Sequence, residues 1–203
     1  AREYAQSYPF APPSTVYGFL LSLVGEIDRL KHQSARIIVG RFNAPALSRV
    51  LRTNFRWKDV KEITSAKNRT PDWQEILTDI RVAIWLADGD SEPAAAQLGT
   101  LRQRVERALK DPSSVERFGG LSLGESSHMV DAIWPMEAYR ERYEEDLDEE
   151  LEILRPEQTG IYTLPVWPNH IGSAGTRWGA YEVFTPEESD RWTPSIEHWT
   201  EVM

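Results

Sequence analysis

Apolar residues recur at helical spacing after a proline-rich start. Pro9, Pro12 and Pro13 disfavour helix in residues 1–13, because proline lacks an N–H and restricts the residue before it. The apolar positions that follow are Val16, Phe19, Leu20, Leu23, Val24, Ile27 and Leu30. They match the i, i+3, i+4, i+7 pattern of an amphipathic helix. We therefore expect a helix over about residues 15–31, with Ser14 as its N-cap.

Later segments alternate between strand and helix patterns. Ile37, Ile38 and Val39 indicate a strand, and residues 80–86 alternate apolar and other side chains with a period of two. The expected elements are a strand over 35–42, a strand over 80–86, a helix over 93–110 that begins at Pro93, and closing strands over 160–167 and 177–184. This order predicts an α+β fold, a sheet with helices on one face.

The order of elements also suggests a particular topology. A strand placed before residue 1 would complete a β-α-β-β-α-β pattern, which is the ferredoxin-like motif. The sequence given begins with Ala1 and not with methionine. We therefore expect that the first strand of the fold is missing from it.

Charge is divided unevenly along the chain, although the net charge is −9. Residues 49–69 carry seven basic side chains against two acidic ones, a net of +5. Residues 137–157 carry ten carboxylates against three arginines, a net of −7. Because a phosphate meets the local field and not the average, the acidic total does not exclude nucleic acid.

The basic segment is the strongest candidate for function. It has few apolar residues and interleaves Phe55 and Trp57 with its cations, so we expect a long mobile hairpin or loop. Such an arm can neutralise phosphates and stack single-stranded bases, with Trp57 as the stacking platform. The expected phosphate contacts are Arg52, Arg56, Lys58, Lys61, Lys67 and Arg69. The alternative is a solvated loop whose charges serve only solubility.

Two further segments are candidates for RNA contact. Ser14, Tyr17 and Gly18 lie at the start of the first helix, where exposed amides attract a phosphate. Gly119 and Gly120 lie in a glycine-rich stretch that would let a nucleic-acid backbone approach closely. That stretch lacks the spacing and the lysine of a nucleotide triphosphate site, and it could equally be a plain connection.

The sequence offers little for catalysis, cofactors or export. There is no cysteine, and the histidines have no metal-ligand spacing, so we expect no metal, no cofactor and no catalytic residue. Ser127, His128 and Asp131 have the residue types of a triad, but neighbours in sequence rarely form one. The apolar stretch 16–24 is too short to span a bilayer, and no export signal appears, so we expect a cytoplasmic protein.

Several stretches together resemble a known family. The run AREYAQSYPFAPPSTVYGFLLSLVGE at residues 1–26 is similar to the proline-rich start and first helix of the Cas-five family, most closely of its Myxococcus-type branch. Weaker matches are RTPDWQEILTD at 69–79 and FGGLSLGE at 118–125. This family supplies the subunit that caps one end of CRISPR Cascade complexes of type I, and the similarity covers most of 1–135.

The resemblance implies a fold and a division of the chain. The family has a ferredoxin-like, RRM-related domain with a hairpin thumb that grips the 5′ handle of the guide RNA. The implied division is a single RRM-like domain over 1–185, containing a thumb excursion at 49–75 and an acidic insertion at 137–157, followed by a C-terminal tail over 186–203.

The resemblance also implies a function. We expect a non-catalytic subunit that binds guide RNA in antiviral defence, with the Cascade backbone subunit, the large subunit and target DNA near the PAM as partners. One branch of the family cleaves precursor guide RNA with a Tyr, Lys and His set. Here the only Lys-His pair, Lys31-His32, ends the first helix. This departure favours a binding role. The alternative is a metal-independent endoribonuclease that uses a histidine with Tyr17 or a lysine as acid–base partners, and a purely structural module is a third possibility.

Overall fold

The computed structural model divides the chain into two compact units. The first comprises Ala1–Pro9 and Asn43–Arg81, and the second comprises Phe10–Phe42 and Val82–Met203. The structure describes residues 4–42, 44–55, 58–90, 92, 99–143, 150–169, 171, 174–187 and 191–202. The expected excursion over 49–75 lies within the first unit, whereas the division into one domain and a tail stays a prediction.

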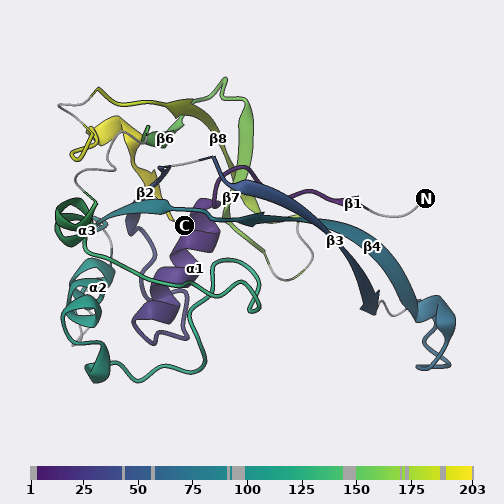
Figure 1. Cartoon of the computed structure of the whole chain (residues 1–203). Helices are drawn as coiled ribbons and strands as arrows, with labels where there is room; N and C mark the ends of the chain where they lie inside the picture. Colours follow the sequence, from purple (N-terminus) through teal and green to yellow (C-terminus); the bar gives the residue numbers. More distant parts are fainter. Residues whose placement is uncertain are drawn as a thin grey trace. The chain divides into compact units, whose positions relative to one another are not determined.

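The first unit is built on a three-stranded sheet in the order β1-β4-β3. Strand β3 (Ala46–Phe55) pairs antiparallel with β4 (Arg69–Thr78) over ten residue pairs, and β1 (Tyr4–Ala5) pairs parallel with β4. A short 3₁₀ helix, η1 (Ala66–Asn68), leads into β4. The basic segment 49–69 thus spans the end of β3, the connection between the strands and the first residue of β4, at the far part of a long twisted hairpin (Figure 1).

The second unit contains a larger sheet whose described pairings are all antiparallel. Its strands run in the order β5-β2-β6-β8-β7, and β9 pairs with β2 beside this path. The strands are β2 (Arg36–Arg41), β5 (Val82–Ala87), β6 (Glu152–Pro156), β7 (Tyr162–Trp167), β8 (Arg177–Phe184) and β9 (Thr200–Glu201). The expected strands at 35–42, 80–86, 160–167 and 177–184 are confirmed as β2, β5, β7 and β8.

Side chains on both faces of this sheet are buried. In β2, Ile37 and Val39 belong to a core cluster with helix α1 (Pro13–Leu23). The intervening Ile38 packs in a second cluster with Phe42 and Ile153. Because successive side chains of a strand point to opposite faces, the continuous apolar run of β2 supplies both cores at once.

The remaining helices are shorter than α1. Helix α2 (Leu101–Lys110) begins with a capping box in which Thr100 and Gln103 satisfy each other's backbone N–H groups. Helix α3 (Met136–Arg142) and the 3₁₀ helices η2 (Pro112–Ser114) and η4 (Ile196–His198) complete the set that the structure describes. The α+β class is confirmed. The expected helix over 93–110 was predicted too long, because α2 begins only at Leu101 after the extended N-cap Thr100; Pro93 itself lies outside the described residues.

Two details of the first helix were predicted wrongly. The N-cap is Pro12 and not Ser14, because Pro13 already occupies the first turn. The helix ends at Leu23 and not near residue 31. Gly25 adopts a φ of +67°, and its N–H and that of Glu26 bond back to Ser22 and Leu21, which closes the last turn in a Schellman motif.

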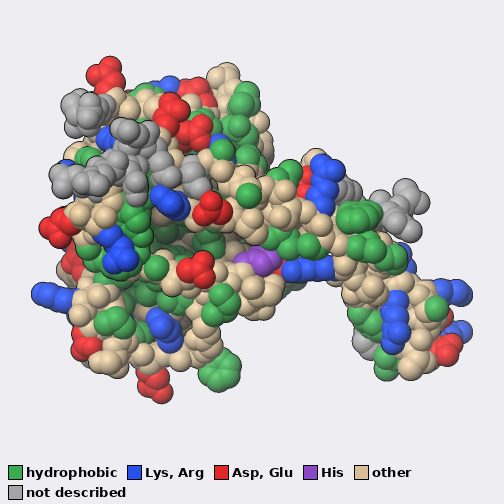
Figure 2. All heavy atoms as spheres, in the orientation of Figure 1, with side chains coloured by type: hydrophobic (Ala, Val, Ile, Leu, Met, Phe, Trp, Pro, Cys, Tyr) green, Lys and Arg blue, Asp and Glu red, His purple; other side chains and the backbone are tan. Residues whose placement is uncertain are grey.

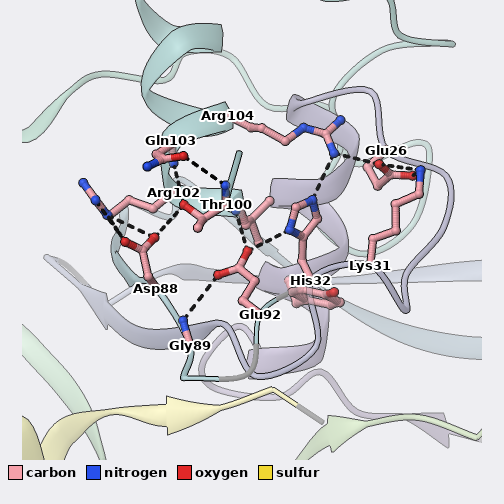
Figure 3. Close-up of polar contacts among 12 residues, drawn as sticks. Glu26, Lys31, His32, Asp88, Gly89, Glu92, Thr100, Arg102, Gln103 and Arg104 are labelled. Carbon is pink, nitrogen blue, oxygen red and sulfur yellow. Dashed lines mark hydrogen bonds and ion pairs between the residues drawn. The ribbon is translucent and has the colours of Figure 1, made fainter. Parts of the chain in front are cut away.

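A buried polar network joins the end of α1 to the start of α2 (Figure 3). The Glu26 carboxylate accepts hydrogen bonds from Arg104 at 2.7 Å and from Lys31 at 2.9 Å. Arg104 also donates to Nε2 of His32 at 3.0 Å, and Nδ1 of His32 lies 2.7 Å from Glu92. Because arginine has no acceptor, His32 must accept at Nε2 and donate from Nδ1, so it is held as one neutral tautomer.

No helix that the structure describes is long and apolar enough to cross a membrane.

The network predicts an acid-sensitive contribution to stability. Burial alone would raise the pKa of Glu26, but hydrogen bonds from Arg104, the Asp28 amide and Lys31 outweigh it and lower the pKa from 4.5 to about 2. The carboxylate therefore stabilises the fold above its unfolded pKa, and this contribution is lost as pH falls from about 4.5 towards 2. We expect Glu26→Gln to lower the free energy of unfolding by about 1–3 kcal/mol near neutral pH.

Urea denaturation of the Glu26→Gln variant and the wild type at a series of pH values would measure this loss. The difference between them should shrink as pH falls below about 4.5. Glu106→Gln is the matched control, because Glu106 pairs with Arg102 on the exposed side of α2 and should change stability by less than about 1 kcal/mol. A Glu26→Gln loss that did not vary with pH would contradict the prediction.

Candidate nucleic-acid interface

The register of the β3–β4 hairpin determines which side chains share a face. Leu51 lies opposite Trp73, and Phe55 lies opposite Arg69. Directly opposed residues of an antiparallel pair point to the same side of the sheet, as do residues two apart on one strand. One face therefore carries Leu47, Arg49, Leu51, Thr53 and Phe55 from β3, and Arg69, Pro71, Trp73, Glu75 and Leu77 from β4. We call this set the Trp73 face.

The Trp73 face exposes large apolar side chains beside cations. Leu51 and Phe55 are each about half exposed, and Trp73 keeps 38% of its surface in solvent. Arg69 is exposed, and Arg49 lies 3.8 Å from Glu75. Flat aromatic rings next to guanidinium groups can stack bases and contact the phosphates between them. Trp73 was not among the residues expected to bind RNA, because a charge count gives no register.

The opposite face of the hairpin has a different character. Arg52 lies opposite Asp72, and the side-chain amide of Asn54 donates to the Asp72 carboxylate at 3.0 Å. Asp72 itself is buried. The alternation of the strand therefore places Arg52 on the face away from Arg69, although both were expected to contact the same RNA.

The loop between the strands is organised by one buried asparagine. The side-chain oxygen of Asn68 accepts hydrogen bonds from the backbone N–H groups of Lys58 and Asp59. Its amide nitrogen donates to the backbone oxygens of Asp59, Glu62 and Ile63. This loop, expected to be mobile, is thus ordered by hydrogen bonds, and Asn68 was not singled out from the sequence.

The lysines of the hairpin loop are exposed. Lys58, Lys61 and Lys67 all reach solvent, and Figure 2 shows basic side chains gathered around the end of the hairpin. Arg56 and Trp57, which complete the expected phosphate contacts and stacking platform, lie outside the described residues.

The start of α1 fits RNA contact less well than expected. Tyr17 is only 3% exposed, and its hydroxyl donates to the backbone oxygen of Arg29 at 2.7 Å. The N–H groups of Thr15 and Val16 both donate to Pro12. Tyr17 is therefore a core side chain that offers little surface for the predicted RNA contact, because the apolar stripe of the helix carries it inward. Ser14 is partly exposed and Gly18 exposed, so their predicted contacts remain open.

The glycine-rich loop is exposed, as a close approach to RNA would require. Gly119 has a φ of +81°, and no atom outside its immediate neighbours would meet an added Cβ. At Gly120 the space of a Cβ is taken by the flexible end of Met129. The neighbouring Phe118 is fully exposed. Gly119 thus leaves its backbone more open to a passing strand than Gly120 does.

No arrangement for metal binding is found in the part of the chain that the structure describes. No group of three or more His, Asp or Glu side chains there could hold a metal ion. His32, which belongs to the polar network between α1 and α2, is 1% exposed and is held between Arg104 and Glu92.

Sequence and structure comparisons relate this chain to known proteins. The chain is 40% identical over 189 residues to the CRISPR-associated protein Cas5 of Myxococcus xanthus (strain DK1622), a match that covers 93% of this chain and 83% of the relative. No protein-family model matches. A chain of a CRISPR RNA-guided surveillance complex superposes with a TM-score of 0.56 over 90% of this chain and 82% of its own length. At 14% identity this likeness shows a shared fold alone. The identity to the Myxococcus protein shows that the chain belongs to the Cas5 family of CRISPR-associated proteins.

Proposed function

We propose that this chain is a non-catalytic subunit of a type I CRISPR Cascade complex and holds the 5′ handle of the guide RNA on its β3–β4 hairpin. Membership of the Cas5 family supports a place in a CRISPR complex. The observation that carries the RNA-binding role is the Trp73 face, where exposed Phe55 and Trp73 lie on the same side as Arg69.

The geometry suggests that the strands of the hairpin stack bases and that its loop contacts phosphates. Bases of the single-stranded handle stack on Phe55 and Trp73, because every base has a π-face and stacking tolerates any sequence. Lys58, Lys61 and Lys67 at the loop contact the phosphates, and the bonds of Asn68 hold the loop backbone in one shape. A frame ordered before binding loses less conformational entropy when RNA binds.

The rest of the proposal concerns the assembly. A ferredoxin-like core in the second unit would contact the Cascade backbone and large subunits and would lie near the PAM of target DNA, as part of antiviral defence. Support for these partners comes from the family alone. The exposed Leu47 and Leu51 on the Trp73 face offer apolar surface that such an assembly could cover.

A guide-RNA endoribonuclease is the second candidate. The burial of two side chains and the raised pKa of one of them disfavour it. His32 and Tyr17 are both buried, so neither side chain can reach a phosphodiester without a large rearrangement. Burial also raises the pKa of the Tyr17 hydroxyl, which makes it a poorer proton donor than an exposed tyrosine. A general acid or base has to lie within hydrogen-bond reach of the proton that it transfers.

The two parts of the hairpin should make different contributions to RNA affinity. Trp73→Ala should weaken binding of labelled repeat RNA by about 1–3 kcal/mol and leave the salt dependence unchanged, because stacking releases no counterions. Replacing Lys58, Lys61 and Lys67 with alanine should weaken binding and also reduce the slope of log K against log salt by about 2. Fluorescence anisotropy over a salt series measures both quantities.

Matched controls separate these effects from damage to the fold. Trp134→Ala removes another partly exposed tryptophan, outside the hairpin, and should leave affinity unchanged. Reversing the charges of Glu144, Glu145 and Asp146 should not weaken binding either, because carboxylates repel RNA. If Trp73→Ala and the triple lysine variant both bound RNA as the wild type does, with melting temperatures preserved, the hairpin would not be an RNA clamp.

The absence of catalysis is a separate prediction. Repeat RNA incubated with the purified chain in excess chelator should stay intact on a denaturing gel while it is bound in anisotropy. Cleavage that disappears in a His32→Gln or Tyr17→Phe variant of unchanged melting temperature would establish the endoribonuclease instead. Cleavage that both variants retain would point to a nuclease centre elsewhere in the chain, and it would equally contradict the proposal.

A further inference from the structure

One edge of strand β8 is paired over only half of its length. Strand β6 pairs with β8 from Phe184 to Tyr181, and the Glu157 N–H then donates to the Ala180 oxygen at 3.0 Å. Strand β7 pairs with the other edge of β8 down to Arg177. Strand β9 pairs with β2. Strand β8 therefore has one edge that faces away from β7. In the ladders that the structure describes, no strand lies beside this edge at Trp178.

The backbone of Trp178 is directed towards this gap. In an antiparallel ladder, the N–H and C=O of one residue point to the same side, and residues two apart repeat that direction. The Ala180 oxygen points away from β7, since it accepts from Glu157. Trp178 lies two residues earlier and so directs its own N–H and C=O the same way. Outside the strand ladders, no backbone hydrogen bond to either group is found among the described residues.

The gap is a hollow of about 430 Å³ between β8 and β9. Its lining includes Pro156, Glu157, Arg177, Trp178, Trp199 and Glu201. Trp178 is 50% exposed, which is unusual for so large an apolar side chain on a strand. The hollow thus combines flat aromatic walls with an unpaired stretch of sheet edge.

Charge around the hollow is acidic. Glu157 and Glu201 line it, and Glu157, Glu182 and Glu197 all lie within electrostatic reach of Arg155. The Arg155 guanidinium is bonded to Glu182, and Arg177 donates to the Glu201 backbone oxygen at 2.5 Å. The charged residues of the lining are thus two carboxylates and one guanidinium group, a net of −1, and the Arg155 charge nearby is paired with Glu182. Such a surface repels phosphates and attracts cations, which disfavours nucleic acid as the occupant.

We propose that this hollow binds an extended basic segment of a partner protein, which adds a strand to β8 at Trp178. The backbone of the segment would pair with the N–H and C=O of Trp178, as in other cases of β-strand addition. Its lysine or arginine side chains would reach Glu157 and Glu201 and lie over the rings of Trp178 and Trp199. This inference lies in the second unit and does not depend on RNA binding by the hairpin.

The test uses the purified full chain and three labelled peptides of about six residues, the usual length of a strand. One alternates lysine with valine, one alternates glutamate with valine, and one is the lysine peptide with a central proline. We expect the lysine peptide to bind in fluorescence anisotropy and the glutamate peptide not to bind. The proline peptide should bind at least about tenfold more weakly, because proline removes a ladder hydrogen bond.

Two variants locate the binding. Trp178→Thr keeps a residue suited to a strand, and Glu157→Gln with Glu201→Gln removes charge at almost constant volume. Each should weaken binding of the lysine peptide by about tenfold or more. Trp134→Ala is the matched control and should not change it. Thermal melting checks the fold of all variants. The glutamine pair should have the melting temperature of the wild type, because both positions are at least partly exposed.

Several outcomes would overturn the inference. They are failure of the lysine peptide to bind, equal binding of the glutamate or proline peptide, and unchanged affinity in the glutamine pair. Binding of a short oligouridylate that Trp178→Thr abolishes would show that the hollow accepts nucleic acid instead of a basic peptide.

Discussion

The antiparallel register between β3 and β4 decides what the basic hairpin can present to a ligand. A strand has two faces, and a shift of one residue would exchange them completely. In the observed register, Trp73, Phe55 and Arg69 share a side. Aromatic surface and positive charge thus coincide where a single strand could use both. The same register places Arg52 opposite the buried Asp72, on the other face of the hairpin.

A regular ladder alone would not hold the loop of this hairpin. A loop between two strands leaves several N–H and C=O groups without partners from the sheet, and each costs free energy if it is buried unsatisfied. Asn68 satisfies five of these groups from a single buried side chain. The lysines then extend from a backbone that is already ordered, so RNA binding would need to order side chains but little main chain.

The sequence predicted the periodic elements and missed the features that depend on contacts between segments. The continuous apolar run around Ile37 gave the correct strand because both faces of β2 are buried, and the alternation over 80–86 gave the strand β5 that pairs with it. The end of α1 was missed, since apolar residues at helical spacing continue to Leu30 although Gly25 turns the chain at a positive φ. Glycine commonly ends a helix, so Gly25 indicated the correct end, but the apolar periodicity was given more weight.

The candidate site shows the same limit more clearly. The excess of lysine and arginine over 49–69 could be counted, but which of them face the same way could not. Trp73 was missed because it lies outside the most basic stretch and joins the site only through pairing with Leu51. Tyr17 was included because it follows a helix start, and only the packing of α1 shows that it is buried.

Opposite charges can serve two ligands on one chain because fields in salt water are short-ranged. At physiological ionic strength, the screening length is about 8 Å, so a phosphate on the hairpin loop responds chiefly to nearby lysines and little to the total of −9. A cation in the β8–β9 hollow likewise responds to Glu157 and Glu201. Each surface would therefore select its ligand by the sign of the charge as well as by shape. If both proposals hold, the acidic hollow would exclude the RNA that the hairpin attracts, and the basic hairpin would exclude a cationic segment suited to the hollow. This mutual exclusion would keep an RNA strand and a basic protein segment from competing for the same surface within one assembly.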